Sequence, residues 1–286
     1  MRTQRAEPAT ERTYAFGEGL RWDADRSELL WVDLLAGRLH RAPLDRLDEP
    51  TTTEVGEPLG AFAPAAAGGF LLAAGQGLAQ LSAAGEVTSG PRLEPESSRM
   101  NDAACDPAGR FWAGSMSYDE RAGAGSLYRV DLDGSTTAVL RGLTIANGPA
   151  WSPDGSVLYL DDSGRGVLLA YDVADDGDLS GERELVRFDT GAGDGLTVDD
   201  EGFLWVAVFG GGAIHRYDPA GRLVARVQVG PSQVSSCCLA GGRLYATTVS
   251  EGLSEPEAGA GRLFVADVGV SGPPVRPYRG ALPPLG

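Results

Sequence analysis

Four polar side chains stand at one phase of an internal repeat, and each could donate an oxygen atom to a metal ion or a substrate. They are Glu18, Asn101, Asn147 and Asp194. Each is followed four residues later by an apolar residue that opens a stretch running through a turn to an apolar strand, and these are Trp22, Cys105, Trp151 and Val198. Equivalent positions of a repeat take equivalent places in a fold, so we expect the four polar side chains to converge on one axis.

The four side chains offer carboxylate and carboxamide oxygen, without thiolate or imidazole. Hard oxygen ligands suit Ca²⁺, Mg²⁺ or Mn²⁺, and carboxylates also allow Zn²⁺ or Fe²⁺. Two or three protein ligands leave coordination positions open for water or substrate, which is typical of a catalytic ion. The alternative interpretation is that each polar residue only satisfies backbone groups where a strand begins.

The repeat covers nearly the whole chain. The same phase falls at Leu59 and Val234, so the six positions are 41, 42, 46, 47 and 40 residues apart. A period of about 40 to 50 residues built of short strands and turns is typical of propeller blades, each a four-stranded sheet. The sequence therefore predicts an all-β, six-bladed β-propeller in which one terminal segment supplies the strand that closes the sixth blade onto the first.

Local patterns agree with short strands and predict one domain. Apolar runs such as ELLWVDLL, SVLYL and FLWVAVFG are bounded by turn sequences such as SPDG and DDEG, and no window has a sustained helical period. Because the repeat is uninterrupted, we expect a single propeller domain over residues 1–286. Residues 1–12 and 272–286 read as terminal tails.

Charge and hydropathy exclude several classes of partner. The net charge is −16, and without a Lys/Arg cluster such a surface repels phosphate backbones, so nucleic acid is not an expected partner. The start lacks the apolar run of a secretion signal and no stretch approaches the length of a membrane span, so we expect no membrane association. Three cysteines, two of them adjacent, make a poor disulfide framework, and a cytoplasmic location follows. A monomer and a small homo-oligomer both remain open.

Other chemistry-bearing residues have ordinary structural interpretations. With only His40 and His215 and no G-x-S-x-G elbow, a nucleophile triad is not indicated. The glycine run TGAGDGLTV precedes a strand rather than a helix, so it is better suited to bringing Asp194 close to the axis than to binding phosphate. The cysteines read as core residues, the tryptophans as packing between blades, and Asp161 and Asp162 as carboxylates that close a turn.

Five segments in order resemble the senescence-marker-protein/gluconolactonase family, which includes regucalcin. They are GEGLRW (17–22), RMNDAACDPAGRFWAGSM (99–116), ANGPAWSPDG (146–155), GDGLTVDDEGFLWVA (193–207) and SSCCLAGG (235–242). The resemblance spans almost the entire chain. It implies a six-bladed β-propeller, in agreement with the repeat count.

The resemblance also implies roles for individual residues. One divalent metal ion would be bound by Glu18, Asn147 and Asp194, and Asp194 would also be the acid/base. Arg99, Asn101 and an acidic residue after the G-S-M segment would contact the substrate. That acidic residue is Asp119 by ungapped alignment, or Glu120 after a shift of one residue, and Asp102 matches a family aspartate beside the substrate asparagine.

The chain departs from the family pattern at Leu20, where the first motif commonly has proline, and in the variable loop around residues 118–124, on which the choice of lactone depends. The implied reaction is hydrolysis of a sugar-acid lactone. The metal polarises the ester carbonyl, Asp194 takes a proton from the attacking water, and Arg99 and Asn101 hold the substrate. A carboxylate bound to a metal is a weak base, so Asp102 is the alternative base.

Two other functions stay open at this point. A phosphotriesterase-like hydrolase would need the same metal but a more apolar pocket. A non-enzymatic calcium-binding propeller would use the metal only to link blades. The open coordination positions and the pair of Arg99 and Asn101 favour the lactonase, because the fold alone does not decide.

Overall fold

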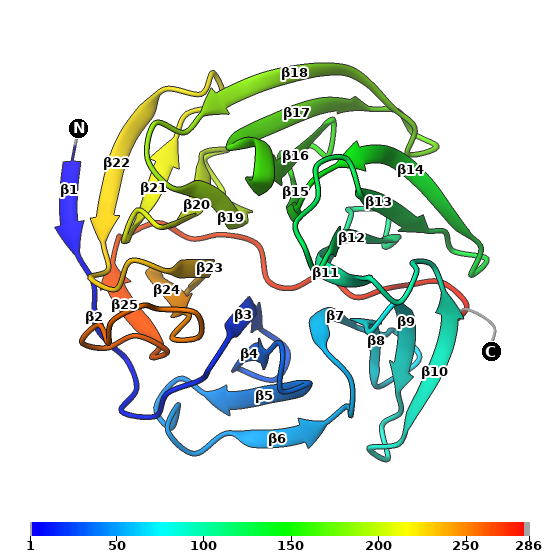
Figure 1. Cartoon of the computed structure of the whole chain (residues 1–286), viewed down its shortest axis with the longest axis horizontal. Coiled ribbons are helices and arrows are strands. Elements are labelled where there is room, and N and C mark those ends of the chain that lie inside the picture. The colour runs from blue at the N-terminus through cyan, green and yellow to red at the C-terminus, as the bar shows by residue number, and fades with distance from the viewer. Residues whose placement is uncertain (1, 283–286) are drawn as a thin grey trace.

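The computed structural model describes residues 2–282, and the end of the predicted C-terminal tail, residues 283–286, lies outside this part of the chain. Six sheets surround one axis as the blades of a propeller (Figure 1). This confirms the predicted fold class. Among the described residues no helix is long and apolar enough to cross a membrane.

Each blade runs outward from an inner strand at the axis through antiparallel neighbours. Blades one to three consist of β3 (Gly17–Asp23), β4 (Glu28–Asp33), β5 (Arg38–Pro43) and β6 (Thr51–Glu54); β7 (Leu59–Pro64), β8 (Phe70–Ala74), β9 (Gly77–Leu81) and β10 (Val87–Arg92); and β11 (Ser98–Cys105), β12 (Phe111–Ser117), β13 (Gly125–Val130) and β14 (Thr136–Leu143). Blade four consists of β15 (Ala146–Trp151), β16 (Val157–Asp162), β17 (Val167–Val173) and β18 (Leu179–Arg187), with the short 3₁₀ turn η1 (Ser163–Arg165) after β16.

Blades five and six are completed by the N-terminus. Their consecutive strands are β19 (Ala192–Val198), β20 (Leu204–Phe209), β21 (Ala213–Tyr217) and β22 (Leu223–Gln228), and then β23 (Val234–Ala240), β24 (Arg243–Thr248) and β25 (Phe264–Asp267). β1 (Arg2–Arg5) pairs in parallel with β22, and β2 (Glu7–Pro8) pairs antiparallel with β25. A terminal segment thus closes the ring, as predicted, but residues 2–8 form strands where the sequence suggested a tail.

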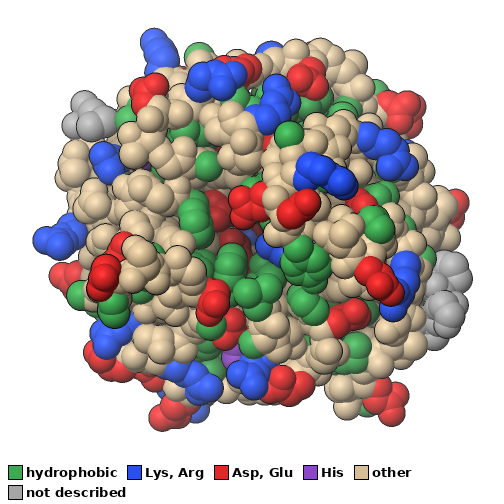
Figure 2. All heavy atoms as spheres, in the orientation of Figure 1, with side chains coloured by type: hydrophobic (Ala, Val, Ile, Leu, Met, Phe, Trp, Pro, Cys, Tyr) green, Lys and Arg blue, Asp and Glu red, His purple; other side chains and the backbone are tan. Residues whose placement is uncertain are grey.

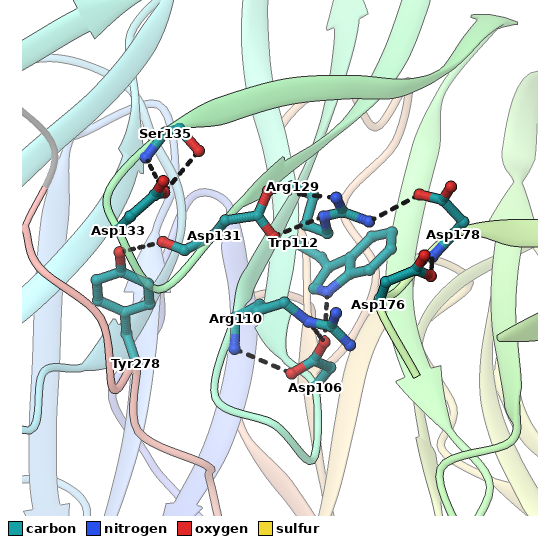
Figure 3. A network of polar contacts seen from close by, with 10 residues as sticks. All are labelled: Asp106, Arg110, Trp112, Arg129, Asp131, Asp133, Ser135, Asp176, Asp178 and Tyr278. Carbon is teal, nitrogen blue, oxygen red and sulfur yellow. Dashed lines mark hydrogen bonds and ion pairs between the residues drawn. The ribbon is translucent and has the colours of Figure 1, made fainter. Parts of the chain in front are cut away.

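The hydrophobic core is divided into six clusters, each between two neighbouring blades. In the cluster between blades three and four the rings of Trp112 and Trp151 meet edge to face, with centroids 5.9 Å apart. Asp106 accepts hydrogen bonds from the indole Nε1 of Trp112 (3.0 Å) and from Nε of Arg110 (2.5 Å), as Figure 3 shows. The tryptophans therefore pack between blades, as the sequence indicated.

The C-terminal segment crosses the propeller behind the axis in the view of Figure 1. The amide of Val275 donates a hydrogen bond to the carbonyl of Trp22 (2.7 Å), and the buried Tyr278 donates its hydroxyl proton to the carbonyl of Asp131 (2.8 Å; Figure 3). This segment covers a cavity of about 70 Å³ formed by the C-terminal halves of the inner strands.

Candidate metal centre and active site

The inner strands carry the candidate residues at one common place. The predicted phase positions 18, 59, 101, 147, 194 and 234 all fall on the inner strands β3, β7, β11, β15, β19 and β23. In every blade the pairing register between the inner strand and the next strand shifts at this place. Such a bulge bends the strand and changes the direction of a side chain. The two apolar members of the set, Leu59 and Val234, still pack into the clusters between neighbouring blades.

The glycine that follows the site residue permits this approach. Gly19 and Gly148 have φ of 58° and 45°, a region that side-chain-bearing residues rarely adopt. A Cβ on Gly148 would lie 2.8 Å from the amide nitrogen of Leu196, which is too close for any side chain. The E-G and N-G pairs of the motifs are therefore required by the backbone of the site.

Hydrogen bonds join the candidate residues of three blades into one chain. Asn101 Nδ2 donates to Asn147 Oδ1 (2.6 Å) and to the carbonyl of Ala146 (3.0 Å). Asn147 Nδ2 donates to Ser163 Oγ (2.9 Å), and Ser163 donates to the carbonyl of Gly193 (2.5 Å), directly before Asp194. The structure thus brings Asn101, Asn147 and the backbone that carries Asp194 together, through a serine that the sequence analysis did not identify.

Glu18 and Asp194 are two buried acidic side chains, and the charge of Asp194 acts on Glu18. Burial and then the neighbouring carboxylates Asp194 and Asp102 raise the pKa of Glu18. Burial, followed by the charges of Asp102 and Asp161, raises the pKa of Asp194 as well. Asp194 Oδ1 is buried and has no hydrogen-bond partner in the part of the chain that the structure describes. A cation bound here would compensate the repulsion between the neighbouring carboxylates. It would also provide a partner for the buried Oδ1 of Asp194.

The donor set fits a divalent ion only if a carboxamide takes part. Within residues 2–282 no group of three or more His, Cys, Asp or Glu side chains could hold a metal ion. Two carboxylates from Glu18 and Asp194 with the amide oxygen of Asn147 give two charges and one neutral ligand, which suits a hard cation. Asn147 Oδ1 accepts one hydrogen bond from Asn101 and keeps a second lone pair for the ion.

The predicted substrate-binding residues all belong to the third blade, on β11 and on the loop after β12. Arg99 Nη1 donates to Asn101 Oδ1 (2.5 Å) and to the carbonyl of Met100 (3.0 Å). Burial lowers the pKa of Arg99, and the nearby charges of Glu18, Asp194 and Glu120 oppose this shift. Figure 2 shows a hollow in the middle of the face turned to the viewer, with acidic and basic side chains gathered in it.

Asp119 and Glu120 are exposed on the loop between β12 and β13. Hydrogen bonding by Ser117 lowers the pKa of Asp119, which therefore has a local partner. Glu120 instead contributes to the electrostatic field at Arg99 and has a left-handed backbone with φ of 52°. Both acidic residues therefore stay candidates for the substrate contact, with Glu120 the one whose charge acts on Arg99.

Asp102 is paired with a residue that the sequence analysis missed. Its Oδ1 accepts hydrogen bonds from Arg21 Nη2 (2.8 Å) and from the amide of Ala103 (2.8 Å). Its Oδ2 is buried and lacks any partner within the described chain. Next to Arg21, the amide of Leu20 donates to Ser236 Oγ (3.1 Å), a bond that the family's proline at this position could not make.

The remaining candidates lie outside this arrangement, except one. Burial lowers the pKa of both His40 and His215 to about 4, and each imidazole bonds a hydroxyl group within its own blade. All three cysteines are free and buried. Asp162 accepts from the amides of Thr144 and Ile145, as a turn-closing carboxylate does. Asp161 differs from the expectation, because it is fully buried and neither of its oxygens has a partner in residues 2–282.

Comparisons with known proteins agree with this architecture. Residues 16–250 match the sequence pattern of the SMP-30/gluconolactonase/LRE-like region. The chain is 35% identical to 6-deoxy-6-sulfogluconolactonase of Pseudomonas putida, covering 90% of this chain and 92% of the relative. It is 33% identical to regucalcin of Danio rerio, covering 92% and 95% of the two chains.

Among solved structures, the calcium-binding protein regucalcin of Agrobacterium tumefaciens superposes with a TM-score of 0.91. It is 27% identical in sequence, and the match covers 98% of this chain and 99% of that one. Because the sequence pattern spans most of the chain and the relatives align almost end to end, the chain belongs to the SMP-30/gluconolactonase/LRE-like family.

Proposed function

We propose that this protein hydrolyses an aldonolactone, such as gluconolactone or a related pentonolactone, with a divalent metal ion held by Glu18, Asn147 and Asp194. The observation that carries the proposal is the buried, unpartnered oxygen of Asp194, which lies next to Glu18 in the field of like charges. The name of the Pseudomonas putida relative, a sulfogluconolactonase, supports a sugar lactone as the substrate class.

The chain's own residues divide the work of the reaction. A bound divalent ion supplies a Lewis acid for the ester carbonyl. We assign to Asp194 the proton of the attacking water, because its Oδ1 is buried and has no hydrogen-bond partner in residues 2–282. Asp102 is less available to bind the attacking water, because its Oδ1 is already held by Arg21 Nη2.

Arg99 and Asn101 orient the lactone. The two hydrogen bonds of Nη1 hold the side chain of Arg99 in place. Its other guanidinium nitrogens have no partner in residues 2–282, so they can donate to a substrate from a fixed position. Fixing a donor before substrate arrives lowers the entropic cost of binding in the reactive geometry. Glu120, on the loop after β12 of the same blade, is suited to accept a hydrogen bond from a ring hydroxyl.

The test is a panel of aldonolactones assayed on chelator-treated protein to which Ca²⁺, Zn²⁺, Mg²⁺, Mn²⁺ or Fe²⁺ is added in turn. We expect no turnover in chelator and recovery with at least one ion. Full activity in excess chelator, with no ion found by elemental analysis, would contradict the metal centre. Turnover of organophosphate esters but not of lactones would favour the phosphotriesterase alternative, and ion binding without turnover of either would favour a calcium-binding propeller.

A further inference from the structure

Directly after each of the six phase positions, five blades carry a small residue and the third blade carries an aspartate. At this position the other blades carry Gly19, Gly60, Gly148, Gly195 and Ser235, whereas the third blade carries Asp102. Space is short here: a Cβ on Gly195 would lie 2.6 Å from Ser236 Oγ, and one on Gly60 would collide with the carbonyl of Asn101. Asp102 is nevertheless accommodated with 2% of its surface exposed.

Three residues after each phase position, five blades carry an uncharged residue and the first blade carries an arginine. The six equivalents all line the cavity of about 70 Å³ behind the site, and they are Arg21, Phe62, Ala104, Ala150, Thr197 and Cys237. Of these six only Arg21 is charged, and its side chain is 12% exposed. A guanidinium so nearly buried among apolar groups is costly unless an anion compensates it.

The two exceptions meet across the axis. Arg21 Nη2 donates to Asp102 Oδ1 (2.8 Å) and to the carbonyl of Ala103 (2.9 Å), and Arg21 Nη1 donates to the carbonyl of Leu20 (2.9 Å). The ion pair therefore links the inner strands of the first and third blades, which are not neighbours in the ring. Asp102 Oδ2 is left buried and unpartnered within the described residues.

Asp102 belongs electrostatically to the metal centre. Its charge acts on both Glu18 and Asp194, in addition to their burial. Without Arg21, the unmatched charge of Asp102 would add to the charges of Glu18 and Asp194 and to that of Asp161, which also acts on Asp194. With Arg21, the charge of Asp102 is matched within the protein, and the charges of Glu18 and Asp194 remain for the ion.

We propose that Arg21 is a positioning residue of the metal centre, which pairs with Asp102 and so would keep this carboxylate from binding the ion as a third anionic ligand. The inference rests on the metal centre of the proposed function. It adds that Asp102 is neutralised by Arg21, whereas Glu18 and Asp194 are left for the ion. Arg21 and the ion then repel each other, while Asp102 and the ion attract each other.

Opposite effects on ion affinity follow from this arrangement. Arg21→Met removes a positive charge near the site, so the affinity for Ca²⁺ should rise by about tenfold. Asp102→Asn leaves Arg21 unmatched, so the affinity should fall by about tenfold. The double variant should return close to the wild-type affinity, because the two removed charges compensate each other. A purely structural role would weaken binding in both single variants.

The experiment is calorimetric titration of chelator-stripped full-length protein with Ca²⁺ and, separately, with Zn²⁺. Arg21→Lys keeps the charge and should stay close to wild type. Arg38→Met is the matched control, because Arg38 pairs with Glu54 at the surface, where the two side chains are 47% and 62% exposed, and it should change nothing.

Two results would overturn the inference: shifts of the same sign in both single variants, or a double variant that does not recover. If Arg21→Met fails to fold, Asp102→Asn decides, since unchanged or tighter ion binding contradicts the proposal. Wild-type protein that binds neither ion would remove the metal centre and the inference together. Wild-type binding with unaltered variants would remove the inference alone, whether or not lactones are hydrolysed.

Discussion

Asp194→Asn should stabilise the metal-free protein, although it damages the metal centre. In the metal-free state Asp194 is a buried carboxylate with an unpartnered oxygen, and Asp102 and Asp161 add like charge. An unsatisfied buried acceptor costs about 1–3 kcal/mol, and more when it is charged. The amide removes the charge and adds two donors, so we expect a gain of about 1–3 kcal/mol in the free energy of unfolding.

The gain should appear as a higher melting temperature in excess chelator, by about 2–4 °C for each kcal/mol in a chain of this size. With Ca²⁺ or Zn²⁺ at about one thousand times the wild-type Kd the order should reverse, because the ion then stabilises wild type by about 4.1 kcal/mol and the variant, which lacks one carboxylate ligand, gains much less. Asp25→Asn, at an exposed position, is the control and should melt like wild type in both buffers.

The sign of the pH dependence provides a second check. Because the folded-state pKa of Asp194 is raised above its ordinary value of 3.8, the folded protein binds this proton more tightly than the unfolded chain does. The resulting stability is fully present below the unfolded pKa and is lost as the pH rises through the folded pKa. Metal-free wild type should therefore lose more stability than Asp194→Asn over that range. An Asn variant that melts below wild type in chelator would refute the reasoning.

Three further predictions concern the reaction. At saturating metal, Asp194→Asn should lower kcat by about 10²–10⁴, the usual worth of a general base, and near-normal turnover would pass this role to Asp102. Asn147→Ala removes a neutral ligand, so it should weaken ion binding by calorimetry, and excess metal should restore part of the rate; unchanged affinity would exclude Asn147 as a ligand. Arg99→Ala should raise KM and leave ion affinity near normal, and kcat should fall as well if the contact strengthens in the transition state; a loss of ion binding would give Arg99 a structural role instead.

The architecture was predictable because every blade of a propeller repeats the same structural elements. Every blade needs the same inner strand, the same bulge and the same turn, so the phase of Glu18, Asn147 and Asp194 could be found by counting residues. The E-G and N-G pairs carried a further signal, since the glycine fits a crowded backbone. Periodicity therefore predicted the fold and the common place of these polar residues on the inner strands.

The pair of Arg21 and Asp102 was not predicted, because residue spacing within one strand does not show which side chains of two different blades meet across the axis. A signal was present, however: both residues break the pattern of their repeat position, where the other blades carry small or uncharged residues. The interpretation of Asp161 was wrong for a similar reason, since a carboxylate at a strand end usually faces solvent or a turn amide. In the structure the carboxylate is fully buried and packs against Gly193 of the next blade. The strands in residues 2–8 lack an apolar alternation, so nothing local distinguished them from a tail.

The closure of the ring by β2 has a consequence for how the molecule folds. Glu7 pairs with Val265, so the sixth blade gains its outer strand only when residues from nearly opposite ends of the chain meet. During synthesis the first five blades can form in order, but the circle stays open until residues 264–265 have been made. Contacts of such long sequence separation slow folding, because loop closure must be completed before they stabilise anything. We therefore expect the last step of folding to be the capture of the N-terminus, with an open ring as the species that precedes it.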